Sequence, residues 1–80
     1  MNNKVKLLKI LMQINPDIDY EQETFLVDDS LFDSLEIMAI ITEIESCFHI
    51  EINPDDIISE NFNSLEMMLK LIERNQWYGE

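Results

Sequence analysis

The sequence predicts a small all-α domain, a four-helix bundle of three principal helices and one short third helix, with a long first loop. Hydrophobic residues make up 46% of the 80 residues, which is enough for a core, and they recur at helical spacing. One Gly and two Pro are too few for the turns of a β-sandwich or barrel. At this length we expect a single domain, residues 1–80, and a disordered chain would hold fewer apolar residues.

The first helix is predicted over about residues 3–14, where apolar residues recur every three or four positions. Its stripe consists of Val5, Leu8 and Met12, with Leu7, Leu11 and Ile14 alongside. Pro16 ends the helix. About residues 15–33 then lack helical periodicity, and a loop of that length in a compact domain is often functional. We expect its apolar residues to pin it to the bundle, namely Ile18, Tyr20, Phe25, Leu26 and Val27.

The second helix is predicted over about residues 34–48, with one broad apolar face. Asp33 suits the N-cap, and Glu36 three residues later completes a capping-box pattern. Ser34 then takes the first helical position, at the exposed positive end of the helix dipole. His49 is expected to end the helix.

A short third helix is predicted over about residues 54–59, because Asn53 suits the N-cap and Pro54 the first position. Ile57 and Ile58 supply its apolar contacts. The fourth helix is predicted over about residues 64–74, with Asn63 as its cap. Its buried stripe consists of Leu65, Met68, Leu69 and Ile72. In the tail, residues 75–80, Trp77 and Tyr78 either pack back on the bundle or lie loose.

Charge excludes several classes of function. Acidic residues outnumber basic ones by 17 to 5, for a formal net charge of −12, so the surface repels nucleic acids and anionic lipids. No apolar run reaches the roughly 18 residues of a membrane span, and no small-residue cleavage site follows the apolar residues near the N-terminus. We interpret the chain as a cytoplasmic monomer without nucleic-acid binding or membrane insertion.

The distribution of charge is uneven. No Lys or Arg stands between Lys9 and Lys70, and every acidic residue except Glu73 and Glu80 lies in that stretch. The acidic field is either a solvated face or a surface that meets a basic partner.

Catalytic and metal sites are not indicated. Cys47 and His49 stand two residues apart on a helix, so their side chains point in different directions. The acidic run after Pro16 imitates the start of a calcium loop, but Gln22 stands where the glycine of the sharp turn belongs. A single Cys forms neither an internal disulfide nor a zinc cluster. We therefore expect neither an enzyme nor a metal site.

One segment does point to a function. Asp33-Ser34-Leu35 opens an acidic amphipathic helix after a long loop, in a chain of this length. Glu45-Ser46-Cys47-Phe48 follows at the end of that helix, then Ile50-Glu51-Ile52, and Glu60-Asn61-Phe62-Asn63-Ser64-Leu65 precedes the last helix. From the first helix to Ile72 the chain resembles the acyl carrier protein family, whose relatives include peptidyl and D-alanyl carrier proteins. The resemblance implies an acyl-carrier-like bundle.

The resemblance also implies that Ser34 is the attachment point of 4′-phosphopantetheine, with Asp33 and Leu35 completing the attachment motif. A phosphopantetheinyl transferase moves the group from coenzyme A to the serine as a phosphodiester, which makes the carrier a phosphoprotein. The distal thiol then holds an acyl or aminoacyl group as a thioester. Partner enzymes carry out the reactions of fatty acid, polyketide or nonribosomal peptide biosynthesis.

Partner recognition is assigned by the same resemblance to the second helix. Glu36, Glu43 and Glu45 are expected to meet Lys and Arg patches on the transferase and on the acyl- or aminoacyl-handling enzymes. Met38 and Leu35 are candidates for an apolar contact, with core packing as the alternative. An acyl tail is expected to find shelter between helices, in a space lined by Ile37, Ile41, Ile57 and Leu69.

Departures from the family pattern refine the expectation. Many carriers have a glycine just before the Asp-Ser pair, where this chain has Ser30-Leu31-Phe32. Ala39 and Ser46 stand where fatty-acid carriers commonly have acids, which favours a specialised pathway. Two alternatives remain: an unmodified, carrier-like adaptor in which Ser34 only starts a helix, and a small hydrolase, which lacks a credible base.

Overall fold

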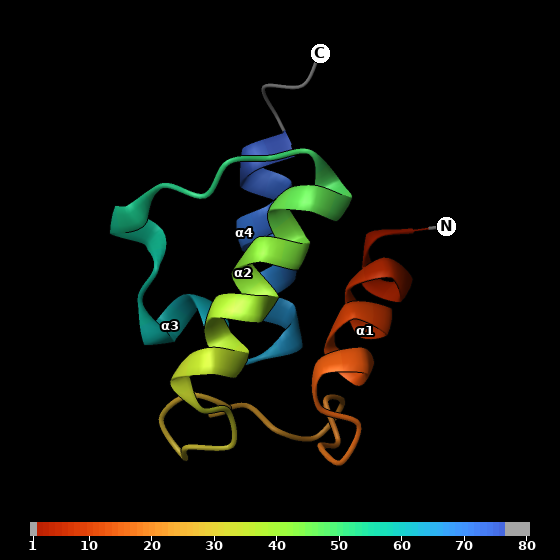
Figure 1. Cartoon of the computed structure of the whole chain (residues 1–80), viewed down its shortest axis with the longest axis vertical. Helices are drawn as coiled ribbons and strands as arrows, with labels where there is room; N and C mark the ends of the chain where they lie inside the picture. Colours follow the sequence, from red (N-terminus) through yellow and green to blue (C-terminus); the bar gives the residue numbers. More distant parts are fainter. Residues whose placement is uncertain (1, 77–80) are drawn as a thin grey trace.

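The structure, a computed structural model, describes residues 2–76, and every regular element in that range is helical. The elements are α1 (Asn3–Ile14), α2 (Ser34–Phe48), a 3₁₀ turn η1 (Pro54–Asp56), α3 (Ser59–Phe62) and α4 (Leu65–Gln76). Helices α2 and α4 run in the same direction and α1 runs opposite to them (Figure 1). The predicted all-α class and the small helical bundle are confirmed.

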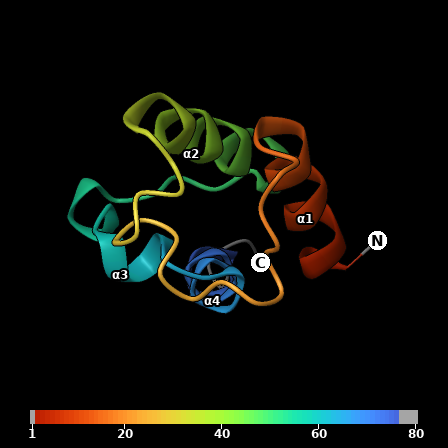
Figure 2. The same cartoon turned by 90° about the horizontal axis from the view of Figure 1, so that it is seen from below.

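A single core lies between the three long helices. Helix α1 packs on α2 and α4, α2 also packs on α4, and the short α3 packs on α4. From below, α4 is seen end-on, α1, α2 and α3 complete a ring with it, and the long loop crosses in front of α4 (Figure 2). The most deeply buried side chains are Leu7, Leu11, Leu26, Ile40, Ile44, Met68, Leu71 and Ile72.

The long loop is held on the core by several of its apolar side chains. Ile18 and Val27, as expected, are partly buried against the core. Tyr20, Leu26 and Phe32 are buried, and Leu26 lies among the most deeply buried residues. The expectation that Phe25 also pins the loop is wrong, because 56% of its surface is exposed. The loop therefore contributes buried side chains to the core up to the residue before Asp33, where α2 is about to start.

The third helical segment differs from the prediction. Instead of one helix over 54–59, the chain makes η1, leaves helical geometry at Ile57 and Ile58, and begins α3 at Ser59. The backbone of Ile58 is extended, with φ −128° and ψ 155°, which interrupts a continuous helix. Both isoleucines are exposed, so the apolar contacts expected of them lie along a surface groove and not in the core.

The start of the fourth helix is also corrected. The Oγ of Ser64 accepts a hydrogen bond from the Met67 N–H at 3.1 Å, so Ser64 caps α4. Asn63, predicted as the cap, instead follows the last residue of α3 and bonds the loop. Helix α4 extends to Gln76, so residues 75 and 76 belong to it, and Trp77 and Tyr78 lie outside the described residues.

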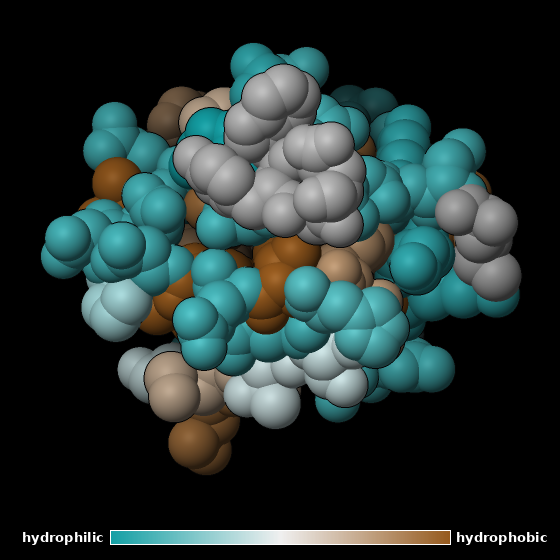
Figure 3. Space-filling view, turned by 90° about the horizontal axis from the view of Figure 1, so that it is seen from above, coloured by the Kyte–Doolittle hydropathy of each residue, from teal (hydrophilic) through white to brown (hydrophobic). Residues whose placement is uncertain are grey.

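The surface is largely polar at the end of the molecule where α2 finishes. Figure 3 views that end and shows mostly hydrophilic residues, with apolar ones visible between them and at the edge of the view. His49 ends α2 there in the left-handed region, with φ 56°. Within residues 2–76, each helix is too short or too polar to cross a membrane.

Candidate functional site

The start of α2 is closed by a complete capping box, as the sequence predicts. The Asp33 carboxylate accepts from the Glu36 N–H at 2.7 Å, and the Glu36 carboxylate accepts from the Asp33 N–H at 3.0 Å. Both orphan amides are thereby satisfied, which fixes where the helix begins. Ser34 is the first residue of α2 and is exposed.

The turn that leads into α2 requires a left-handed residue. The Leu31 N–H bonds the Leu26 carbonyl and the Ser30 N–H bonds the Val27 carbonyl, which is the pattern of a Schellman turn. Ser30 takes the left-handed position, with φ 59°. A residue other than glycine costs about 1–2 kcal/mol there. Glycine would suit the backbone at position 30, but this chain has serine there.

A polar network ties the end of α1 to the start of α2. The Asn15 side-chain amide donates to the second Glu36 carboxylate oxygen at 3.1 Å. The Tyr20 hydroxyl lies 3.0 Å from the Leu11 carbonyl oxygen and 2.6 Å from that of Asn15. Burial, and next the negative charge of Glu36, raise the pKa of Tyr20 to about 12.

The loop is also fastened to the junction of α3 and α4. The Asn63 side-chain oxygen accepts from the N–H groups of Val27 and Asp28 at 2.9 and 3.0 Å. Its amide donates to the Asp28 carboxylate at 3.1 Å, and its backbone carbonyl accepts from the Leu26 N–H at 2.8 Å. Asn63 is buried. It therefore holds three consecutive loop residues, and two of them, Leu26 and Val27, supply the carbonyls of the Schellman turn.

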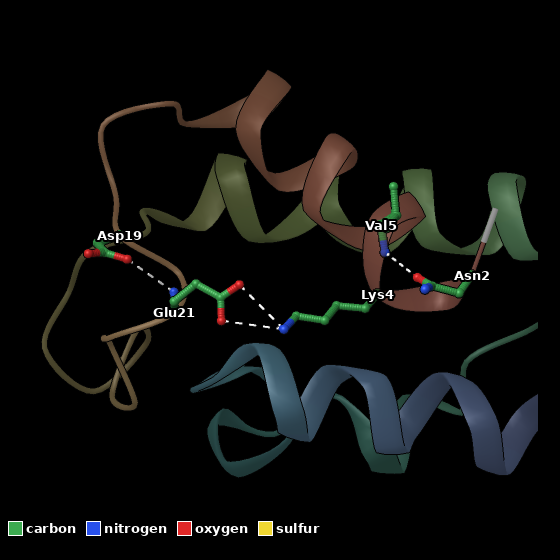
Figure 4. A network of polar contacts seen from close by, with 5 residues as sticks. All are labelled: Asn2, Lys4, Val5, Asp19 and Glu21. Carbon is green, nitrogen blue, oxygen red and sulfur yellow. Dashed lines mark hydrogen bonds and ion pairs between the residues drawn. The ribbon is translucent and has the colours of Figure 1, made fainter.

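The first part of the long loop, around Asp19 and Glu21, contacts the start of α1. Lys4 Nζ lies 3.4 Å from each carboxylate oxygen of Glu21, and the Asp19 carboxylate accepts from the Glu21 N–H at 3.2 Å (Figure 4). Both partners of the ion pair are exposed, so it contributes little to stability.

The three glutamates assigned to partner recognition occupy different environments. Glu36 and Glu45 are half-buried, and Glu43 is exposed. Both Glu36 carboxylate oxygens accept hydrogen bonds, from the Asp33 N–H and the Asn15 amide, and the Glu45 carboxylate accepts from the Ile52 N–H at 2.9 Å. Glu36 and Glu45 thus have structural roles, and their part in recognition stays a prediction.

The apolar candidates beside Ser34 face solvent. Leu35 is 80% exposed and Met38 is 61% exposed. The alternative of core packing is therefore excluded for both.

Two of the four residues predicted to shelter an acyl tail come together. Ile37 and Ile57 line one apolar groove of about 220 Å³, with Val27, Ile58, Ser59 and Phe62. Ile41 is buried in the core, and Leu69 lines a different hollow beside Tyr20 and Ser64. The groove lies between α2, α3 and the loop, one turn along α2 from Ser34.

Comparison with known protein families shows to which family the chain belongs. Residues 6–72 match the family described as phosphopantetheine attachment site. The chain belongs to this family. Comparison with curated proteins and with solved structures gave no match.

Members of the family carry 4′-phosphopantetheine covalently on a serine, so the chain is a phosphopantetheine-carrying carrier protein. Such carrier domains are in general non-catalytic, and they interact with a phosphopantetheinyl transferase and with biosynthetic enzymes.

The residues at the start of α2 fit this group. Of the five serines, Ser64 uses its hydroxyl as a cap, and Ser30 and Ser46 lie in a turn and late in α2. Ser59 opens α3, a helix of four residues without a side-chain cap. Ser34 alone among them is an exposed serine that opens a long, capped helix.

The sequence indicates Tyr20 as a loop anchor and Asn63 as a cap, but it does not predict the hydrogen bonds by which these two residues and Asn15 support this position. Asn15, Tyr20 and Asn63 hold the loop and the start of α2 through contacts distant in sequence. Asn63 and Ser64 are adjacent and both suit an N-cap, but a helix has one N-cap residue. The sequence therefore indicates that one of the two has a different role.

Proposed function

We propose that the protein is a freestanding, monomeric cytoplasmic carrier that holds acyl or aminoacyl groups on 4′-phosphopantetheine attached to Ser34. The observation that carries the proposal is the exposed hydroxyl at the capped start of α2, in a chain that belongs to the attachment family. When attached, the group supplies a terminal thiol that holds the cargo as a thioester. The carrier is not itself an enzyme, and partner enzymes load and use the cargo.

The chain's own residues hold the attachment point steady and accessible. Asp33 fixes the first turn of α2, and Glu36 joins that turn to Asn15 at the end of α1. Ser34 therefore stands at a fixed helix start and is itself exposed. A helix N-terminus also favours the negative phosphodiester, while Asp28, Asp29 and Asp33 oppose it, and a covalent link keeps the group in place against them.

The groove between α2 and α3 is large enough to shelter only part of a cargo group. Its volume of about 220 Å³ lies below the roughly 300–1,000 Å³ of pockets that enclose small molecules. We expect Ile37 and Ile57 to contact part of an apolar cargo, and we expect partner enzymes to set the choice of cargo. Strong discrimination among acyl chains by the isolated, loaded protein would contradict this.

A specialised pathway of polyketide or nonribosomal peptide type is favoured over housekeeping fatty acid synthesis. Ala39 and Ser46, which replace acids of fatty-acid carriers, are both exposed on α2. Partners of this chain therefore meet fewer charges on α2 than partners of such carriers do.

Intact mass spectrometry tests the proposal. The protein is incubated with coenzyme A, magnesium and a broad-specificity phosphopantetheinyl transferase, alongside the variants Ser34→Ala and Ser30→Ala. We expect one phosphopantetheine on the wild type and on Ser30→Ala, and none on Ser34→Ala. Ser30 is the matched control because it is an exposed serine just before α2. A folded wild type that gains nothing beside an active control carrier would instead support the unmodified adaptor, or a carrier that needs a dedicated transferase.

A further inference from the structure

Asn15, at the C-terminal end of α1, uses both its backbone and its side-chain polar groups. Its backbone N–H donates to the Leu11 carbonyl at 2.8 Å, and its backbone carbonyl accepts from the Tyr20 hydroxyl at 2.6 Å. Its side-chain oxygen accepts from the Asp17 N–H at 3.1 Å, and its side-chain amide donates to the Glu36 carboxylate at 3.1 Å. The residue therefore connects the last turn of α1, the first part of the loop and the start of α2.

The two partners of the Asn15 side chain fix its orientation. The Asp17 N–H requires an acceptor and the Glu36 carboxylate requires a donor, so exchanging the oxygen and nitrogen of the amide would break both bonds. The other Glu36 carboxylate oxygen accepts from the Asp33 N–H at 3.0 Å. Within residues 2–76 no cation pairs with Glu36, so the Asn15 amide is the donor from another helix that balances its charge.

This series of bonds ends at the attachment residue. Asp33 is the N-cap of α2, and Ser34 follows it as the first helical residue. If the Glu36 side chain turns away, the Asp33 N–H loses its acceptor and the first turn of the helix frays. The end of α1 and the start of α2 lie at the same end of the molecule (Figure 1). The position of Ser34 thus depends on a side chain of another helix.

We propose that Asn15 is a positioning residue for the modification of Ser34, and that it acts through Glu36 by holding the capping box closed. Glu36 then serves the reaction through its bond to Asn15, and not through contact with a cation of the transferase. The inference rests on the proposed function, since it takes Ser34 as the residue that is modified.

The reaction depends on where the Ser34 oxygen lies. This oxygen bonds the phosphorus of the pantetheine phosphate, the phosphoanhydride of coenzyme A breaks, and the leaving nucleotide takes the electron pair. The hydroxyl proton passes to a base of the transferase. A displacement of about 1 Å at a reacting atom can slow such a transfer by about 10²-fold. A frayed first turn therefore slows modification even when the protein stays folded.

An exchange of the two polar side chains tests this proposal. Asn15→Asp alone places two carboxylates against each other, and Glu36→Gln alone places two amides against each other, so each single substitution breaks the bond. Together they restore it, with the donor now on α2 and the acceptor on α1. The carboxylate at position 15 still accepts from the Asp17 N–H, and glutamine at position 36 still closes a capping box. The net charge of the double variant is that of the wild type.

The experiment measures kcat/KM of a phosphopantetheinyl transferase for the wild type, the two single variants and the double variant, with circular dichroism to confirm folding. Hydrogen exchange at the Asp33 amide is a readout that does not depend on the enzyme. We expect each single substitution to lower kcat/KM about fivefold or more and to speed this exchange, because a hydrogen bond to a charged group is lost. The double variant is expected to return to within about twofold of wild type in both measurements.

Gln13→Glu combined with Glu36→Gln is the matched control. It returns the carboxylate to α1 at an exposed residue, but without the bond. We expect this control to be as slow as Glu36→Gln alone. Rescue by the control would show that charge alone matters, and the positioning role would be wrong.

Single variants as fast as the wild type, or a double variant no faster than Glu36→Gln, would also overturn the positioning role. If Asn15→Asp does not fold, the comparison of Glu36→Gln with the double variant decides the same question. In these outcomes the wild type is still modified on Ser34, so the proposed function stands. A wild type that no transferase modifies on Ser34 overturns the proposed function and this inference together.

Discussion

Tyr20 joins three segments around the start of α2. Its hydroxyl lies between the carbonyl oxygens of Leu11 and Asn15, at 3.0 and 2.6 Å. Its ring stacks on Phe32, with 6.1 Å between the ring centroids. Because only the neutral phenol donates to these carbonyls, this position depends on the protonated form of Tyr20.

This dependence predicts a loss of stability at alkaline pH. The pKa of Tyr20 rises from 10.0 to about 12 on folding, so the folded state holds the proton more tightly. The stabilisation is fully present below pH 10 and is lost as pH rises toward about 12. Urea unfolding of wild type and Tyr20→Phe at several alkaline pH values checks this. The variant is expected to be about 1 kcal/mol less stable at neutral pH. The difference between the two proteins should shrink as pH rises, and a constant difference would contradict the assignment.

Ser30 gives a second prediction for a single residue. Glycine removes the cost of about 1–2 kcal/mol for a left-handed serine, but it adds about 0.5–1 kcal/mol of unfolded-chain entropy. We expect Ser30→Gly to raise the free energy of unfolding by about 0.5–1 kcal/mol. Ser46→Gly, an exposed helical control, should lower it by about 0.5 kcal/mol. Urea denaturation measures both, and destabilisation by Ser30→Gly would show that the serine side chain has a further contact.

The loop and α3–α4 act as one unit through Asn63. Its side chain and carbonyl bond the backbone of Leu26, Val27 and Asp28, residues that precede it by 35 or more positions. These bonds hold the loop beside the groove that Val27 and Phe62 both line. The width of the groove therefore depends on a residue at the end of α3.

Removal of this amide tests the role of the junction. Asn63→Ala leaves the Val27 and Asp28 N–H groups without their acceptor, so we expect a loss of about 2 kcal/mol or more in unfolding free energy. Faster hydrogen exchange at those two amides should accompany it. Asn53→Ala is the control, because Asn53 makes a single exposed cap bond to Asp55 in η1 and should cost about 1 kcal/mol or less. Equal costs for the two variants would remove Asn63 from this role.

At the scale of helices, the sequence predicts the features that depend on residues close together in the chain. Helix α2 was predicted with its bounds, because an apolar face, Asp33 and Glu36 all agree on where it starts. The split of η1 from α3 was missed, since Pro54, Asp55 and Asp56 suit the first turn of a 3₁₀ helix as well as that of an α-helix. The role of Asn63 was missed because its partners lie far away in the sequence.

The candidate site divides in the same way. The position of Ser34 follows from the attachment motif and the capping box, both of which are local. The hydrogen bonds from Asn15 to Glu36 and from Tyr20 to Asn15 depend on how α1 and the loop pack, so no spacing in the sequence announces them. Of the four residues predicted to shelter an acyl tail, only Ile37 and Ile57 share a groove. Helical spacing predicts which face of a helix is apolar, but it does not predict which cavity that face lines.

Charge is separated across the whole molecule. All five basic residues lie on α1 and α4, and two of them are already engaged: Lys4 with Glu21, and Lys6 over the Phe48 ring at 4.9 Å. Fourteen of the 17 acidic residues lie in the loop, on α2 and in the segment up to α4, two more lie on α4, and the net charge is −12. Self-repulsion among them should destabilise the folded state at neutral pH and low salt.

Added salt or divalent cation is therefore expected to raise Tm. The Debye length falls from about 10 Å at 0.1 M to about 3 Å at 1 M ionic strength, which removes most repulsion between exposed carboxylates. The double variant Asp29→Asn, Glu43→Gln should be more stable than wild type at low salt, and the two should converge at high salt. Thermal melts across a salt series measure this, and a flat response in both proteins would contradict it.

The carrier function depends on one residue, and fragmentation mass spectrometry of the modified protein locates the prosthetic group directly. After treatment with coenzyme A and the transferase, the peptides that contain the five serines are compared. We predict 4′-phosphopantetheine on Ser34 alone. Its appearance on Ser59, the other exposed serine that opens a helix, or on any residue besides Ser34, would contradict the account.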